Sequence, residues 1–342
     1  LILFDSTFVN SLGGINVLTT LIKSIDFRDR KFFILVVDVR NKKLEFEKYK
    51  GFNQIIYCKN NLFSRFFLIN TLRKKIDIIF TLGNVPNLVL SGKYQLTYNM
   101  QSLIFEYQKL KYPNNIKWLF KSQVIKFLFK LSDSDVAVQT KTMQILFKNF
   151  FNDRENKIHD FPVFKDIKIK NQTEKRNQEY VYISSGEKYK NVELLIRSFS
   201  LFKEKYPGEK LHLTIGKKYN DLIDLIDYTN SISKNSFIIN HGSITNKEAL
   251  SLLMKNKFLV HPSAIESFGI VLIEGSYLDN IIIAPDLNYV YDVCEPNITF
   301  NLNEESLLKA LLLSKKNDFK PTPTLINNKS KNLINYLILN NG

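Results

Sequence analysis

Cysteine, histidine and tryptophan are rare in this chain: its 342 residues include two, four and one of them. Cys58 and Cys294 are too few and too scattered to build a disulfide framework or a zinc site. No two histidines have the spacing of metal ligands. No run approaches about 18 uninterrupted apolar residues, and the start has no signal-peptide pattern, so we expect neither a membrane-spanning helix nor export. A reduced, cytoplasmic setting is the one these absences favour.

Positive charge is unevenly distributed along the chain. There are 48 Lys and Arg residues against 33 Asp and Glu residues, a net charge of +15. Residues 1–150 contain 23 basic and 10 acidic residues, net +13, and the remainder contains 25 and 23, net +2. Such a basic half should bind an anionic surface or substrate. Helix-turn-helix, zinc-finger and RNP-type motifs are all missing, which disfavours nucleic acid as the partner.

Short apolar segments alternate with amphipathic segments in the first half. The apolar segments predict strands over residues 1–5, 32–39, 54–58, 77–83, 94–98 and 135–139. The amphipathic segments predict helices over residues 15–25, 64–75 and 116–131. Alternation of this kind is typical of a parallel sheet with helices on both faces.

A polar stretch at residues 165–179 interrupts this pattern and predicts a linker. The alternation then restarts, and strands are expected over residues 180–185, 211–216, 237–242, 258–263, 281–286 and 298–302. Helices are expected over residues 191–205, 246–256, 269–278 and 304–314. The sequence therefore predicts two α/β domains, 1–165 and 166–325, and a tail over 326–342 that could cross back to the first domain.

The stretch HPSAIESFGIVLIEGS (261–276) combines two carboxylates with a predicted helix start. Glu266 lies in the loop after a predicted strand, Ser267 could cap the helix that follows, and Glu274 lies about two turns further on. Three amides should point out of the helix N-terminus, where anions bind: those of Phe268, Gly269 and Ile270. Amides for a diphosphate and carboxylates for hydroxyl groups suit a sugar nucleotide.

This stretch resembles the Glu-x7-Glu signature of the family-four retaining glycosyltransferases. In that family the first Glu lies near the donor sugar and phosphate and the second holds the nucleotide ribose, which implies these roles for Glu266 and Glu274. The resemblance also implies the GT-B fold, in which two Rossmann-like domains face a central cleft. The first domain would bind the acceptor and the second the nucleotide-sugar donor. The alternative is a surface helix with two unrelated acids.

The segment SSGEKYKN (184–191) resembles the diphosphate-binding loop of the same family. Lys190 matches its lysine, a fixed cation that stabilises the charge on a departing nucleoside diphosphate. Lys190 and Asn191 directly precede a predicted helix, where a cation is unfavourable, so Lys190 should have an anionic partner. The alternative is an exposed lysine at a helix start.

The same loop departs from the family pattern at one point. Many relatives have a Gly-Arg pair six residues before the lysine, where this chain has Ser184 and Ser185. Lys188 could replace that cation, or the two serine hydroxyls could hydrogen-bond the phosphate instead. Because no Asp-x-Asp motif ends a strand, Lys190 and the helix amides would do the work of a metal ion. We expect no metal and no cofactor, and a UDP-sugar rather than a GDP-sugar as donor.

Two segments of the first half match the family more loosely. Gly13 and Gly14 follow the first predicted strand, where a glycine pair lets the chain pass close to the donor phosphate and the acceptor. A tight turn explains them about equally well. Asn99, followed by the apolar run 103–105, loosely matches an acceptor-side segment, and a partly buried polar loop is the alternative there.

The histidines are divided between site and structure. His261 ends a predicted strand beside the Glu266 loop and could approach the donor. His241, which precedes Gly242, ends another strand that should face the same cleft. His159 and His212 are expected to be structural.

Residues 116–131 place four lysines among Trp118 and three phenylalanines. At helical spacing the apolar residues exceed what one core face needs, which suits a helix on a membrane surface. An ordinary core helix with a solvated lysine face fits equally well.

The resemblance implies a retaining, metal-independent hexosyltransferase-type glycosyltransferase. We expect it to move a sugar from a nucleotide donor to a glycan or lipid-linked glycan during surface-polysaccharide biosynthesis, such as O-antigen or capsule, at the inner face of a bacterial cytoplasmic membrane. The partners expected are the nucleotide-sugar, the acceptor and an anionic membrane surface, with no nucleic acid. The alternative is a non-catalytic membrane- or polyanion-binding protein on a degraded GT-B fold.

Overall fold

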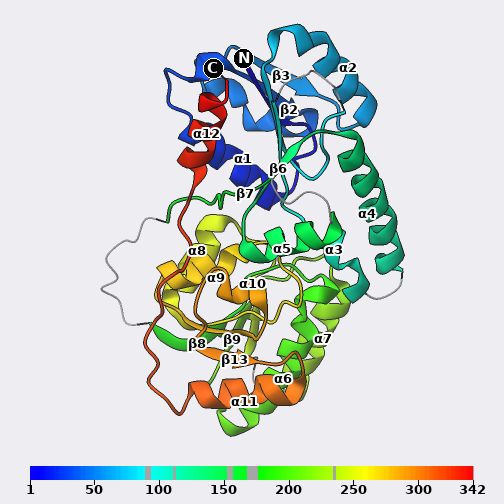
Figure 1. The fold of residues 1–342 in the computed structure, drawn as a ribbon. Coiled ribbons are helices and arrows are strands. Elements are labelled where there is room, and N and C mark those ends of the chain that lie inside the picture. The colour runs from blue at the N-terminus through cyan, green and yellow to red at the C-terminus, as the bar shows by residue number, and fades with distance from the viewer. Residues whose placement is uncertain (89–93, 111–112, 152–156, 168–175, 234–235, 342) are drawn as a thin grey trace. The chain divides into compact units, whose positions relative to one another are not determined.

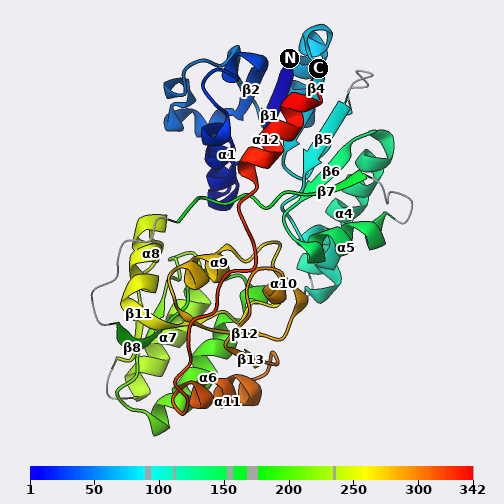
Figure 2. The ribbon, with the colours of Figure 1, turned by 60° about the vertical axis from the view of Figure 1, so that its left-hand side comes forward.

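The structure is a computed structural model that describes residues 1–341 except 89–93, 111–112, 152–156, 168–175 and 234–235. It divides into two compact units (Figures 1 and 2). Unit 1 comprises Leu1–Asp166 and Asn327–Gly342, and unit 2 comprises Ile167–Ile326. The predicted linker at 165–179 lies largely outside the described residues.

Unit 1 contains a seven-stranded parallel sheet with the order β3-β2-β1-β4-β5-β6-β7. Its strands are β1 (Ile2–Ser6), β2 (Phe33–Asp38), β3 (Gln54–Cys58), β4 (Ile78–Leu82), β5 (Tyr94–Tyr98), β6 (Asp135–Val138) and β7 (Ile158–Asp160). The central strands β1, β2 and β4 are buried along their whole length, as their continuous apolar sequences require in a sheet covered on both faces.

Helices cover both faces of this sheet. They are α1 (Leu12–Ser24), α2 (Leu62–Leu72), α3 (Leu103–Glu106), α4 (Asn114–Leu131), α5 (Lys141–Phe150) and α12 (Ser330–Leu339). α1 and α12 pack together on one face, in the core that contains Phe4 and Phe80. α2, α4 and α5 cover the other face, through separate clusters around Leu3 and Val136. The last helix of the chain is therefore part of unit 1.

Unit 2 contains a six-stranded parallel sheet with the order β10-β9-β8-β11-β12-β13. Its strands are β8 (Asn177–Val181), β9 (Leu211–Leu213), β10 (Ile238–Asn240), β11 (Asn256–Val260), β12 (Ile281–Pro285) and β13 (Ile298–Phe300). Its helices are α6 (Val192–Lys205), α7 (Asn220–Ile232), α8 (Asn246–Lys255), α9 (Ile270–Tyr277), α10 (Asn288–Tyr291) and α11 (Glu304–Ser314).

Each sheet reverses its strand order once, between β1 and β4 in unit 1 and between β8 and β11 in unit 2. Ligands of open α/β sheets bind outside the carboxyl ends of the strands at such a point. Two expected strands end early here: β8 stops at Val181 and β11 stops at Val260. Residues 182–185 and 261–263 therefore belong to the loops that border this position.

Candidate active site

The candidate site of unit 2 is formed by the loops that follow β8 and β11, at the point where the strand order reverses. Two contacts join these loops. The amide of Ala264 donates to the carbonyl of Tyr189 over 2.8 Å. The side chain of Asn191 donates to the carbonyl of Pro262 over 3.0 Å. These contacts join residues 75 and 71 positions apart in the chain and hold the two sequence motifs side by side.

Lys190 and Glu266 form an ion pair at the centre of this site. Lys190 Nζ lies 2.5 Å from Glu266 Oε1, and the side chains are 12% and 14% exposed. Burial raises the pKa of Glu266, but the Lys190 ammonium and the neighbouring His261 outweigh it, and the pKa is about 2. The carboxylate is therefore ionised at neutral pH, and it is the anionic partner that the position of Lys190 demanded.

Asn191 fixes where Lys190 lies. Lys190 ends a short 3-10 turn, Lys188–Lys190, and Asn191 caps α6 with a left-handed backbone, φ 53° and ψ 36°. Asparagine tolerates this conformation better than most residues because its short polar side chain bonds locally. The turn leads the chain from β8 into α6 and places Lys190 beside Glu266.

His261 also lies against Glu266. It is 2% exposed, and its Nε2 is 3.1 Å from Glu266 Oε1, although without hydrogen-bond geometry. Its ring meets the ring of Tyr289 edge to face, and the Tyr289 hydroxyl donates to the carbonyl of Ser263. His261 Nε2 and Lys190 Nζ therefore approach the same oxygen of Glu266.

The start of α9 differs from the expectation in one respect. The cap is Gly269, with a left-handed backbone of φ 70° and ψ 44°, so the prediction that Ser267 caps the helix is wrong. Of the three predicted amides, that of Ile270 lies in the first turn, that of Gly269 at the cap, and that of Phe268 before it. A left-handed cap favours glycine over serine, which explains the shift.

Glu274 lies on α9 and is 8% exposed. Its Oε1 accepts a hydrogen bond of 3.0 Å from Nδ2 of Asn246, the first residue of α8. No sequence pattern marks Asn246, because its partner lies 28 positions away on another helix.

The serines that stand in place of Gly-Arg have partners of their own. The backbone amide of Ser184 donates to the Thr214 hydroxyl, which in turn donates to the Ser184 carbonyl. The Ser185 hydroxyl donates to the carboxylate of Glu187. Glu187 also accepts from the hydroxyl of Tyr219. Burial raises the pKa of Glu187, but these two hydroxyls, together with a backbone hydrogen bond and the charge of Lys218, outweigh it, and the pKa is lowered overall. Glu187 was missed by the sequence analysis. Lys188 is exposed.

His241 and Gly242 are not brought to the ion pair. They follow β10, the outermost strand of the sheet. His241 Nε2 lies 3.0 Å from Nδ1 of His212, whose Nε2 lies 2.8 Å from Glu179. Burial and the adjacent His212 lower the pKa of His241.

The candidate residues of unit 1 lie in two places. Gly13 and Gly14 belong to the first turn of α1, not to the loop before it as expected, because Ser11 caps the helix and accepts from the Gly14 amide. A Cβ on Gly14 would lie 3.0 Å from Val9, whereas one on Gly13 would meet nothing within 4 Å. Asn99 is fully buried after β5 and accepts from the Gln101 amide.

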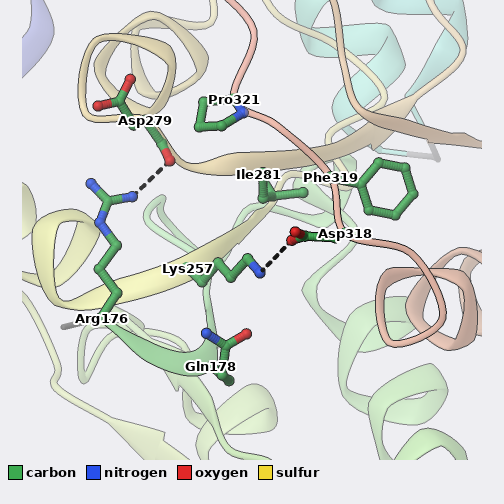
Figure 3. Close-up of a pocket in the computed structure, with 8 residues that line it drawn as sticks. All are labelled: Arg176, Gln178, Lys257, Asp279, Ile281, Asp318, Phe319 and Pro321. Carbon is green, nitrogen blue, oxygen red and sulfur yellow. Dashed lines mark hydrogen bonds and ion pairs between the residues drawn. The ribbon is translucent and has the colours of Figure 1, made fainter.

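A cavity of about 330 Å³ lies at the other end of the unit 2 strands, away from the candidate site (Figure 3). It is lined by Arg176, Gln178, Lys257, Asp279, Ile281, Asp318, Phe319 and Pro321, around the amino ends of β8, β11 and β12. Arg176 donates to the carbonyl of Asp279, and Lys257 lies 3.7 Å from Asp318, so its cations already have partners. No predicted site residue lines it.

Two further properties concern the described residues as a whole. None of their helices has the length and apolarity needed to cross a bilayer. They contain no group of three or more His, Cys, Asp or Glu side chains arranged to hold a metal ion.

Residues 163–319 match the family described as glycosyl transferases group 1. No curated protein matches the chain. Solved structures share the fold of the whole chain. HepE (Alr3699) of Anabaena, in complex with UDP and glucose, is 14% identical with a TM-score of 0.70, over 99% of this chain and 96% of HepE. WaaG, a glycosyltransferase involved in lipopolysaccharide biosynthesis, is 12% identical with a TM-score of 0.67, over 93% and 91%. The sucrose-phosphate synthase of Thermosynechococcus elongatus is 12% identical with a TM-score of 0.69, over 92% and 90%.

Proposed function

We propose that this chain, a GT-B fold whose residues 163–319 match the group 1 glycosyl transferases, transfers a sugar from a UDP-sugar to a glycan or lipid-linked glycan with retention at the anomeric carbon. The observation that carries the proposal is the buried Lys190–Glu266 pair at the switch point of the donor-side sheet. HepE was solved with UDP and with UDP-glucose, which supports a uridine donor.

Lys190 would act by exchanging partners. In the structure its ammonium is paired with Glu266, and a bound diphosphate would offer it a second, more highly charged anion. When the bond between the anomeric carbon and the phosphate oxygen breaks, negative charge grows on that oxygen, and a fixed ammonium stabilises it. The first amides of α9 would bind the same diphosphate. Together these groups would neutralise it without a metal ion.

Retention follows if the acceptor attacks from the face that the phosphate leaves. A bond then forms between the acceptor oxygen and the anomeric carbon while the carbon–phosphate oxygen bond breaks, and the acceptor proton passes to the departing phosphate. No side chain has to act as general base. Glu266 would hold the donor sugar, and Glu274, oriented by Asn246, would accept hydrogen bonds from the ribose hydroxyls.

WaaG supports a role in surface-polysaccharide assembly, since it acts in lipopolysaccharide biosynthesis. We place the protein at the cytoplasmic face of the membrane, with the basic first half binding anionic lipid or the phosphates of a lipid-linked acceptor. Loss of the Gly-Arg cation, with the Ser185 hydroxyl already bonded to Glu187, favours a second candidate, a non-catalytic polyanion-binding protein.

The test is a panel of UDP- and GDP-sugars incubated with the purified full chain, followed by mass detection of released nucleotide and of glycosylated products. Turnover of one donor, even to water, supports the transferase, and NMR of the anomeric proton in the product checks retention. Nucleotide binding without turnover across the panel and a set of lipid-linked acceptors would favour the second candidate.

A further inference from the structure

The helices α2 and α4 cover the same face of the unit 1 sheet (Figure 1). Strand register establishes this. Leu3 on β1 pairs with Ile79 on β4, and Thr81 lies two residues further along β4. Thr81 pairs with Thr97 on β5, which pairs with Val136 on β6. Paired residues of neighbouring strands point to the same side, as do residues two apart on one strand. Leu3 lies in the cluster beneath α2 and Val136 in the cluster beneath α4, so the outer surfaces of both helices point away from the sheet on the same side.

The outer surface of α4 is apolar. Its exposed apolar residues repeat every three or four positions and form one stripe: Ile116, Phe120, Val124, Phe127 and Leu131. Phe120 is 72% exposed and Phe127 is 59% exposed, while Ile125 and Phe129 on the opposite side pack into the core. Helical spacing places Lys117 and Lys121 along one border of the stripe and Lys126 and Lys130 along the other.

The outer surface of α2 repeats this arrangement in its first two turns. Leu62, Phe63, Phe66 and Phe67 are 49%, 72%, 45% and 52% exposed. The rings of Phe63 and Phe67 lie 4.5 Å apart, centre to centre, and form a small aromatic cluster on the surface. Exposed cations lie at its ends: Lys59, Arg73, Lys74 and Lys75.

The inner surface of α2 is fixed by a buried ion pair. Arg65 Nε donates to Asp5 Oδ2 at the end of β1 over 2.6 Å, and the two side chains are 3% and 1% exposed. Arg65 also donates to the carbonyl of Pro86 and to the Thr81 hydroxyl. Rotating α2 to bury its phenylalanines would tear this pair out of the core, so the aromatic cluster is held outward.

The basic residues around α2 and α4 indicate which kind of partner would cover their exposed apolar side chains. Residues 48–76, which include α2, and residues 107–132, which include α4, contain no Asp or Glu. Basic groups that border exposed apolar side chains repel a second copy of the same face but suit anionic headgroups above an acyl layer. We propose that α2 and α4 together form a docking face for an anionic bilayer, in which Phe63, Phe66 and Phe67 enter the headgroup region. This deepens the proposed function, since it rests on the membrane setting given there and assigns α2 to it.

The first test is vesicle sedimentation of the full chain carrying Phe63→Ser, Phe66→Ser and Phe67→Ser. With vesicles of equal phosphatidylcholine and phosphatidylglycerol, binding should fall at least tenfold relative to the native chain. The matched control is Leu339→Ser, because Leu339 is 81% exposed on α12, which covers the opposite face of the sheet. Equal binding by the triple variant and the native chain would overturn the role of α2.

The second test locates α2 relative to the bilayer. Trp118 on α4 is the only tryptophan of the chain, so Phe66→Trp combined with Trp118→Phe gives one fluorophore on α2. Brominated lipids in anionic vesicles should quench it. The control is Phe27→Trp with Trp118→Phe, which should stay unquenched because Phe27 is 66% exposed in the loop after α1, the helix that covers the opposite face of the sheet. Absence of quenching on α2 would overturn the proposal.

Two other outcomes are separable. The native chain could instead form dimers in the absence of lipid, and the triple substitution could dissociate them. In that case a second copy of the chain covers this face and the bilayer proposal is wrong. If lipid binding behaves as expected while no donor is turned over, the docking face stands and the proposed transferase activity fails.

Discussion

Single residues of unit 2 determine whether the site is catalytic, and Lys190 is the most direct test. Lys190→Ala should lower kcat by roughly 10²–10³, by analogy with the loss of one preorganised donor to a developing anion. Glu266→Ala should be comparably damaging. Both are measured as turnover of the donor found in the panel, with Lys205→Ala, an exposed lysine at the end of α6, as the control. Near-native turnover in both variants would remove this pair from the mechanism.

Glu274 tests ribose binding separately from chemistry. Because its carboxylate is almost fully buried and charged hydrogen bonds are worth ~1–3 kcal/mol, Glu274→Gln should weaken UDP affinity about tenfold or more. Isothermal titration calorimetry measures the change, and Glu305→Gln on the exposed face of α11 is the matched control. An unchanged UDP affinity in Glu274→Gln would contradict the assignment.

The ion pair should also make stability depend on pH. The folded pKa of Glu266 is about 2, below its ordinary value of 4.5, so its contribution is complete above pH 4.5 and is lost as pH falls toward 2. Between pH 4.5 and pH 2, the free energy of unfolding of the native chain should therefore fall by up to roughly 3 kcal/mol more than that of Glu266→Gln. Chemical denaturation of both proteins at each pH measures the difference. Parallel pH profiles of the two proteins would show that the pair does not stabilise the fold.

At the scale of helices and strands, the sequence predicted most elements but not all of their ends. The alternation of apolar and amphipathic segments placed strands such as 54–58 and 94–98 and the helix 304–314 at their observed bounds. β7 was missed because a strand of three residues, Ile-His-Asp, is too short to show an alternating pattern. α12 was missed because the apolar residues of this short helix are buried only by packing in the core that contains α1. The GT-B fold class is confirmed by both sheets and by the solved structures.

The residues of the candidate site could be predicted only where they belong to a motif that is continuous in the sequence. Lys190 and Glu266 stand out as local patterns, and the structure places them together. Glu187 and Asn246 have no local signal, since Glu187 bonds to Tyr219, 32 positions away, and Asn246 bonds to Glu274 on another helix. Ser267 was assigned as the cap because serine is a common helix cap, yet the left-handed backbone at Gly269 decides the helix start.

That helix start is testable by adding one methyl group. Gly269→Ala forces a left-handed backbone on alanine and brings its Cβ to 3.3 Å from Leu272, so the free energy of unfolding should fall by roughly 1–2 kcal/mol. Gly208→Ala is the control, because a Cβ there meets nothing within 4 Å. Denaturant titration measures both variants. Equal stability would mean that α9 accepts another cap.

For the molecule as a whole, the charge division between the two halves is the property to test. Residues 1–150 carry +13 and the rest +2, and each Lys near an anionic surface is worth ~1 kcal/mol. Replacing Lys117, Lys121, Lys126 and Lys130 by Gln should therefore cut binding to anionic vesicles at least tenfold. Raising the salt to 1 M should do the same to the native chain, because the screening length falls to about 3 Å.

The control removes the same charge elsewhere. Four exposed lysines of unit 2, Lys205, Lys255, Lys316 and Lys320, are replaced by Gln, which lowers the net charge equally but leaves α4 intact. If position matters, this variant binds anionic vesicles almost as the native chain does, and turnover with a soluble acceptor is unchanged in both. Equal loss in the two variants would mean that total charge alone drives binding. Equal binding of the native chain to neutral and anionic vesicles, or to neither, would instead assign the basic half to the phosphates of the acceptor.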